Sequence, residues 1–128
     1  MAAAAQAGRR AVAPYSNFRV GAALLTRKGT IFSGANVESA SYGLTCCAER
    51  VALFKALTAG EREFSAIAIV ARVASGPTPC GACRQLLAEY APGAIVWLAD
   101  SLNTKSAREF SVRELLPAPF LAVPSKSV

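Results

Sequence analysis

An early segment of the chain, residues 18–25, has apolar residues at every second position in the manner of a β-strand: Phe18, Val20, Ala22 and Leu24. Arg27-Lys28-Gly29 is typical of a hairpin turn, so we expect residues 30–37 to form the returning strand. The alanine-rich residues 1–12 predict a helix that ends before Pro14. The chain therefore opens with a helix followed by a β-hairpin.

The rest of the chain alternates helix-like and strand-like segments. Apolar residues recur at helical spacing after Cys47, and again after the helix-start signal Thr78-Pro79. Residues 38–45 lack periodicity and predict a loop, while residues 100–105 are too few for a crossover helix and predict an antiparallel connection. The pattern predicts helices at 47–60, 79–90 and 112–116 and strands at 66–73, 94–98 and 107–111. These elements predict an α/β fold with three α/β/α layers and a mixed sheet of about five strands.

Length and composition are typical of a folded domain. The chain has 128 residues, of which 53% are hydrophobic and 17% charged. Disordered chains show the opposite balance. We expect a single domain over residues 1–128, with a C-terminal tail at 121–128. The sequence leaves open whether residues 1–10 are ordered.

Charge and hydropathy argue against two classes of partner. The formal net charge is +6, but the basic residues are scattered or paired, without the concentrated stripe typical of nucleic-acid-binding surfaces. The longest mostly apolar stretch, residues 64–74, contains Arg72 and is too short to span a membrane. Arg9-Arg10 follows the first apolar residues, whereas the basic residues of a signal peptide precede them. We expect a cytoplasmic protein that binds neither nucleic acid nor membrane.

The chain contains no histidine, which removes several kinds of active site. Ser-His-Asp and Cys-His nucleophile systems are excluded, and so are histidine-ligated zinc sites. Four cysteines form two tight pairs, Cys46-Cys47 and Cys80-Gly81-Ala82-Cys83. This spacing favours a metal or redox site over the disulfide framework of a small secreted protein.

Three of these cysteines stand at predicted helix starts. Cys80 and Cys83 project from one face of a first helical turn, and Cys47 opens the other long helix. Free N–H groups and the positive end of the helix dipole favour thiolates there. If the two helices follow neighbouring strands, their three thiolates converge. Three protein ligands with one open coordination position are typical of a catalytic zinc site. Glu49 is then the candidate proton carrier, and Arg50 is a candidate hydrogen-bond donor to a ligand sulfur.

Two other interpretations remain open. Cys80-Gly81-Ala82-Cys83 follows a predicted strand and opens a helix, as in a thioredoxin-like redox site, which leaves Cys47 unexplained. A structural zinc module would take Cys46 as its fourth ligand. We interpret Cys46 instead as a buried, inert thiol, because adjacent residues rarely bind one tetrahedral ion together. Arg84 is a second candidate for the role given to Arg50.

The two cysteine motifs resemble those of a known enzyme family. Cys47-Ala48-Glu49-Arg50 and Pro79-Cys80-Gly81-Ala82-Cys83-Arg84-Gln85 are similar to the zinc motifs of the small, homotetrameric cytidine deaminases. The likeness extends to residues 13–24, 36–43 and 115–120, and covers roughly residues 11–120. Ser39 stands where the family pattern has asparagine, and Cys46 where an apolar or small residue is typical.

The resemblance implies a reaction and a set of site residues. The reaction is zinc-dependent hydrolysis of cytidine and deoxycytidine to uridine and deoxyuridine plus ammonia in pyrimidine salvage, by attack of zinc-bound hydroxide at C4. One zinc ion per chain would be held by Cys47, Cys80 and Cys83, with Glu49 as proton shuttle. The implied contacts to the free nucleoside are Phe18 and Val20 shaping the pocket, Asn36 and Glu38 on the ribose hydroxyl, and the backbone of Ala48 at the exocyclic group.

The resemblance also implies a tetramer with shared active sites. In the family, a C-terminal phenylalanine reaches a neighbouring subunit's pocket and stacks on the base, and loop residues contribute to shared sites. Phe120 and Tyr42 occupy these positions here. The alternative within the enzyme class is a deaminase for another aminopyrimidine nucleoside, such as blasticidin S, although Asn36-Val37-Glu38 favours a free ribose. Deamination of RNA or DNA is disfavoured because the chain lacks added basic elements that would hold a polynucleotide.

Overall fold

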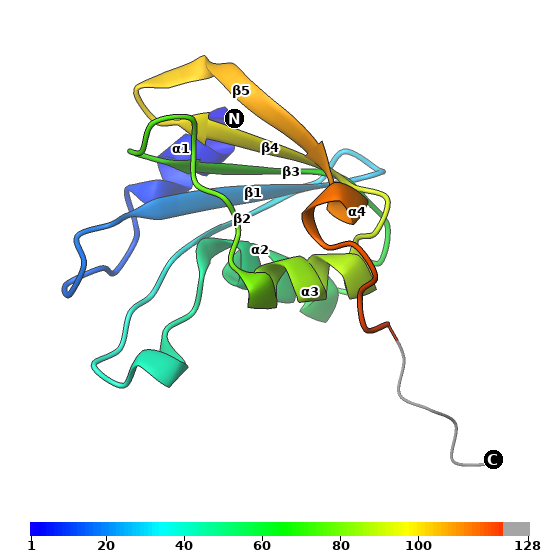
Figure 1. Ribbon diagram of the computed structural model, residues 1–128, viewed down its shortest axis with the longest axis horizontal. Helices are drawn as coiled ribbons and strands as arrows, with labels where there is room; N and C mark the ends of the chain where they lie inside the picture. Colours follow the sequence, from blue (N-terminus) through cyan, green and yellow to red (C-terminus); the bar gives the residue numbers. More distant parts are fainter. Residues whose placement is uncertain (122–128) are drawn as a thin grey trace.

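The computed structural model describes residues 1–121 and contains one mixed β-sheet (Figure 1). The strand order is β2-β1-β3-β4-β5, in which β3 and β4 are parallel and all other neighbours are antiparallel. The elements are α1 (Ala2–Gly8), β1 (Val20–Thr26), β2 (Ile31–Ala35), the 3-10 helix η1 (Tyr42–Leu44), α2 (Ala48–Thr58), β3 (Phe64–Ala71), α3 (Gly81–Tyr90), β4 (Ile95–Asp100), β5 (Asn103–Ser111) and α4 (Val112–Leu115). The C-terminal tail expected at residues 121–128 lies outside the described residues except for Leu121.

Helices cover both faces of the sheet, which confirms the predicted three-layer α/β/α arrangement. Short apolar side chains of α1 and of β1, β3 and β4 form the core on one face, including the fully buried Ala4. The larger core on the other face lies between the sheet and helices α2, α3 and α4, and contains Leu24, Leu53, Ile67, Leu87 and Leu98. Burial of these apolar side chains on both faces stabilises the sheet.

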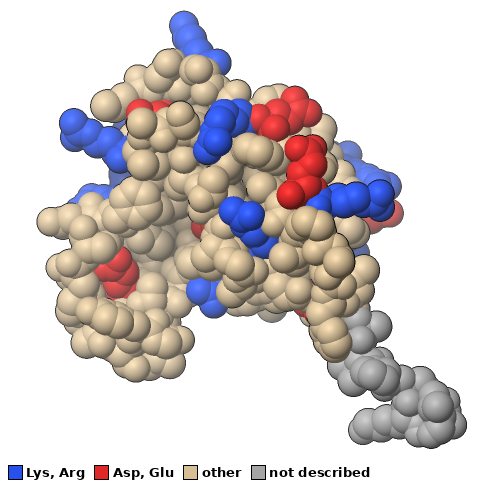
Figure 2. Space-filling view, viewed as in Figure 1, with Lys and Arg blue, Asp and Glu red and all other residues tan. Residues whose placement is uncertain are grey.

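No single charged patch dominates the face of the molecule shown in Figure 2. Lys and Arg side chains are spread over this face without forming a continuous stripe (Figure 2). Within residues 1–121, no helix is both long enough and apolar enough to cross a membrane.

The topology brings the starts of α2 and α3 to the same edge of the sheet. β2 and β3 are each antiparallel to β1, so they are parallel to one another. The helix that follows each of them must return along the sheet, and both helices therefore begin at the carboxyl ends of these strands. The condition stated from sequence, that the two helices follow neighbouring strands, is wrong, because β1 lies between β2 and β3. Parallel orientation, rather than adjacency, aligns the two helix starts.

The first helix and the first strand are shorter than the sequence predicts. α1 ends at Gly8 rather than at residue 12, because Val12 pairs with the chain after β2: its N–H donates to Asn36 O (2.9 Å) and its carbonyl accepts from Glu38 N (2.8 Å). β1 begins at Val20 rather than at residue 18, because the backbone here pairs with the side-chain amide of Asn36 instead of with a neighbouring strand: Asn36 Nδ2 donates to Phe18 O (2.8 Å).

The last hairpin is tighter than the predicted connection over residues 100–105. β5 begins at Asn103, directly after a turn made by Ser101 and Leu102. Asp100 Oδ1 accepts a hydrogen bond from Leu102 N (3.0 Å), a local contact that favours such a turn. The predicted antiparallel pairing of β4 with β5 is confirmed. The first residues of β5 are polar and mostly exposed, so no alternation of apolar and polar residues in the sequence marks them as a strand.

Gly21 allows α1 to lie directly against β1. A Cβ atom at Gly21 would lie 1.8 Å from Ala4 O and 2.5 Å from Gly8 N, distances far below van der Waals contact. Both of these atoms belong to the backbone of α1, so no side-chain rotation can make room. The N-terminal helix therefore depends on glycine at this position.

We expect Gly21→Ala to lower the free energy of unfolding by about 3 kcal/mol or more, because α1 must move away from the sheet. Urea unfolding followed by circular dichroism measures the change. Gly43→Ala is the matched control, since nothing lies within 4 Å of a Cβ at Gly43. Equal stability of the two variants would contradict the tight contact between α1 and β1.

Candidate metal centre and active site

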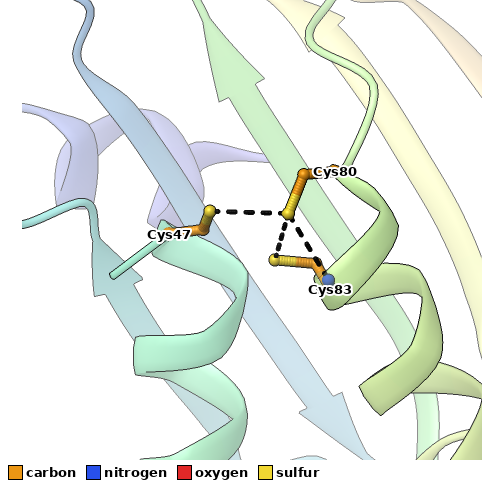
Figure 3. Close-up of side chains that lie close together, drawn as sticks. All are labelled: Cys47, Cys80 and Cys83. Atoms are coloured by element: carbon orange, nitrogen blue, oxygen red, sulfur yellow. Dashed lines mark hydrogen bonds between the residues drawn. The ribbon is translucent and has the colours of Figure 1, made fainter. Parts of the chain in front are cut away.

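Three cysteines from two helix starts meet at the carboxyl edge of the sheet (Figure 3). Cys47 is the N-cap of α2 and Cys80 is the N-cap of α3, while Cys83 lies in the first turn of α3. The Cys80 sulfur accepts a hydrogen bond from the Cys83 backbone N–H (3.5 Å), which fixes this turn. Cys83 is buried, Cys80 is exposed and Cys47 is partly buried, so the cluster is reached from solvent on one side.

The three sulfur atoms are spaced as ligands of one ion would be. Cys47 Sγ lies 3.7 Å from Cys80 Sγ, and Cys80 Sγ lies 3.4 Å from Cys83 Sγ. All three sulfurs lie within 4.8 Å of one another. Sulfur ligands about 2.3 Å from a tetrahedral zinc ion lie roughly 3.8 Å apart. The donor set therefore fits zinc with three protein ligands.

The fourth cysteine does not belong to this cluster. Among residues 1–121, the converging group comprises Cys47, Cys80 and Cys83 without Cys46. Cys46 is held by two backbone hydrogen bonds to Val37 (2.8 and 2.9 Å), and burial raises the pKa of its thiol. The geometry therefore provides three sulfur ligands rather than the four of a closed structural site.

Arg50 contacts one of the clustered sulfurs. Its Nη2 lies 3.4 Å from Cys47 Sγ and 3.4 Å from Thr45 O. Hydrogen bonding from the Cys83 thiol, followed by Arg50, lowers the pKa of Cys47 to about 5. A sulfur with such a pKa is a thiolate at neutral pH, which is the form that binds metals. Arg84 points elsewhere: its guanidinium donates to the backbone carbonyls of Pro79 (2.8 Å) and Leu115 (3.0 Å).

Glu49 is a buried carboxyl beside the sulfur cluster. It lies in the first turn of α2 and is 6% exposed. Burial raises the pKa of Glu49 to about 7, and the charge of the Cys47 thiolate adds to this effect. A carboxyl group with a pKa near neutrality can both accept and release a proton.

Comparison with known proteins identifies the family. Residues 1–99 match the family model described as the cytidine and deoxycytidylate deaminase zinc-binding region. The chain belongs to this family.

Individual relatives and a solved structure agree with this assignment. The cytidine deaminase of Halalkalibacterium halodurans is 50% identical over 119 residues, covering 93% of this chain and 89% of the relative. The cytidine deaminase of Sporosarcina psychrophila is 45% identical over 115 residues, covering 90% of this chain and 84% of the relative. The crystal structure of cytidine deaminase from Burkholderia pseudomallei has 51% identity and a TM-score of 0.89, and covers 93% of this chain and 94% of that chain. The protein is an enzyme of the cytidine deaminase family.

In this member of the cytidine deaminase family, Asn36 already has backbone partners. Its Oδ1 accepts from Val20 N (2.9 Å), and its Nδ2 donates to Phe18 O (2.8 Å). The buried amide thus continues the pairing of β1 beyond the end of β2. One amide hydrogen and one lone pair remain for a further partner.

Glu38 is held by the loop that precedes β1. Its carboxylate accepts from the backbone N–H groups of Tyr15 and Ser16 (both 3.1 Å) and from the Ser16 hydroxyl. The Ser16 hydroxyl, ahead of the backbone contacts, keeps the pKa of Glu38 below its usual value. Glu38 lines a cleft of about 320 Å³ together with Tyr15, Ser16, Ser39, Tyr42 and Thr45. Thr45 connects this cleft to the sulfur cluster through Arg50, which donates both to the Thr45 carbonyl and to Cys47 Sγ.

Of the remaining predicted site residues, Tyr42 lines this cleft, whereas Phe18 lines a separate hollow beside α1 and the backbone of Phe120 contacts Gln85 of α3. Val20 and Ala48 are buried, whereas Phe18 is 41%, Phe120 62% and Tyr42 81% exposed. Sequence reasoning gave no role to Ser16 or Thr45, although both belong to the hydrogen-bond network of the site. Ser16 lies within residues 13–24, a segment that resembles the family, and this resemblance could have marked it as a site residue.

Proposed function

We propose that this protein catalyses the hydrolytic deamination of cytidine and deoxycytidine to uridine and deoxyuridine, with release of ammonia. The observation that carries this proposal is the convergence of three cysteine sulfurs beside the buried carboxyl of Glu49. A site with three thiolate ligands and a neighbouring proton carrier suits hydrolysis better than disulfide exchange, which needs only two thiols.

Zinc is the metal that this donor set favours, with one ion per chain. Cys47, Cys80 and Cys83 would hold it, and the hydrogen bond from Arg50 to Cys47 would offset part of the negative charge of the thiolates. When bound, zinc acts as a Lewis acid that makes a coordinated water acidic near neutral pH.

Glu49 moves the protons of the reaction. Its carboxylate accepts a proton from the attacking water and delivers it to N3 of the base. It then accepts the second proton, from the hydroxyl now bonded to C4, and passes it to the departing amine. The buried position of Glu49, with its raised pKa, supports both transfers near neutral pH. The backbone of Ala48, between Cys47 and Glu49, contacts the exocyclic amino group.

The ribose is bound on the side of the site that carries Asn36 and Glu38. Glu38 offers a carboxylate acceptor for a ribose hydroxyl, and Asn36 offers the amide groups left free by its backbone contacts. Phe18, which lies two residues before β1, and Val20, the first residue of β1, shape the pocket. The cleft beside Glu38 has room for a small nucleoside, and the dispersed basic residues in Figure 2 favour such a substrate over a polynucleotide.

Further copies of the chain complete the site in a tetramer. Tyr42 and Phe120 are largely exposed aromatic residues, and each is available to contact another subunit's pocket. Equilibrium sedimentation tests this by comparing the particle mass with the 13.3 kDa of one chain. The protein acts in the cytoplasm on free nucleosides, in pyrimidine salvage.

Loss of ultraviolet absorbance on incubation with cytidine tests the proposed function. We expect metal-replete protein to turn over cytidine, a chelator to lower the rate more than about 100-fold, and added zinc to restore it. Elemental analysis should find one zinc per chain. A metal-replete protein that leaves cytidine unchanged would overturn the proposed function, and a measurable dithiol potential without zinc would favour the redox interpretation.

A further inference from the structure

The chain after α4 returns to the helix that carries two of the clustered cysteines. We call residues 116–121 the C-terminal segment; it runs past α3 in Figure 1. Leu116, Pro119 and Leu121 of this segment line a small hollow of about 170 Å³, together with Ala88 and Pro92 at the end of α3. Leu116 also packs against the core that includes Leu87 and Ala88 of α3, which holds the start of the segment near this helix without fixing the position of each later residue.

Two consecutive residues of α3 donate hydrogen bonds to backbone carbonyls near the two ends of the C-terminal segment. Arg84 Nη1 donates to Leu115 O (3.0 Å), and Gln85 Nε2 donates to Phe120 O. Both residues directly follow Cys83 along α3. The helical turn that places a sulfur in the cluster therefore also fixes the backbone of residue 120.

The conformation of the C-terminal segment needs such restraints. Ala118, between the two contacted carbonyls, has φ 52°, which is unfavourable for a residue with a Cβ atom. A residue persists in this region only where the surrounding structure holds it there. The Phe120 ring is 62% exposed although its backbone is held, so the segment presents a free aromatic ring from a fixed position.

We propose that Gln85 is a positioning residue for Phe120. By donating to the Phe120 carbonyl, it sets where the exposed ring stands relative to the helix that carries Cys80 and Cys83. This inference rests on the proposed function, in which the ring stacks on the base. Arg84 differs from Gln85 because it also contacts Pro79 O and so supports the start of α3 itself.

Gln85→Glu tests the inference, because glutamate has the same size but no N–H to donate. We expect KM for cytidine to rise about three- to tenfold with kcat nearly unchanged. Amide exchange in residues 116–121, measured by mass spectrometry, should quicken at least threefold. Zinc content should stay at the wild-type value. Gln6→Glu, the same chemical change on α1, is the matched control and should leave KM and exchange unchanged.

A double-mutant cycle separates positioning from general loosening. Phe120→Ala should raise KM roughly tenfold or more by removing the stacking ring. Gln85→Glu should add nothing to that effect, because Gln85 acts through Phe120. Unchanged exchange in Gln85→Glu, an unchanged KM, or additive effects in the double variant would each overturn the proposal. A wild-type protein inactive on cytidine would overturn the proposed function and the role toward substrate, while exchange would still decide whether Gln85 holds the segment.

Discussion

Glu49→Gln is expected to lower kcat for cytidine by roughly 10⁴-fold while the protein keeps its zinc. The amide has the size of the carboxyl and fits the same buried space, so packing in the first turn of α2 is preserved. It cannot accept a proton from water or deliver one to the base. The expected loss is thus a loss of chemistry rather than of structure or of metal.

Steady-state kinetics, zinc analysis and thermal unfolding of the same sample measure this prediction. Glu89→Gln is the matched control. It removes the same charge as Glu49→Gln, but from an exposed position on α3. The control should retain wild-type kcat. Full activity of Glu49→Gln would remove Glu49 as the proton carrier, and loss of zinc would assign it a role in holding the metal.

The order of helices and strands was predictable because apolar periodicity reports burial directly. The apolar residues of β1 and the continuous apolar run of β3 match strands that are mostly buried on both faces. β5 was only partly predictable: its first residues are polar and exposed at the sheet edge, so no burial pattern marks them. The strand order was not predictable from periodicity either. The placement of β1 between β2 and β3 depends on long-range pairing.

The candidate site was predictable where its chemistry is local in sequence. Cys47 and Glu49 lie in one helical turn, as do Cys80 and Cys83, so spacing alone placed them on helix starts. The backbone contacts of Asn36 were not predictable, because the groups that its side chain contacts lie 16 and 18 positions earlier in the chain. The same holds for Gln85, whose partner Phe120 is 35 positions away.

Cys80→Ser is expected to lower the affinity for zinc more than 100-fold and to abolish turnover along with the metal. Changes around a metal site that leave every ligand in place already cost about 10- to 100-fold, and this change removes a ligand sulfur. Serine is not deprotonated at neutral pH and cannot replace the thiolate. The fold should survive, because Cys80 is exposed and serves as the N-cap of α3, a position that serine favours.

Elemental analysis after dialysis against a chelator, with far-ultraviolet circular dichroism for the fold, measures this prediction. Cys46→Ser is the matched control and should keep both zinc and activity, because Cys46 lies outside the sulfur cluster. The two variants make the same atomic change at sites with opposite expected outcomes. If Cys46→Ser lost the metal and Cys80→Ser retained it, the ligand set would be wrong. If both lost it, all four cysteines would bind the ion and no coordination position would remain for the attacking water.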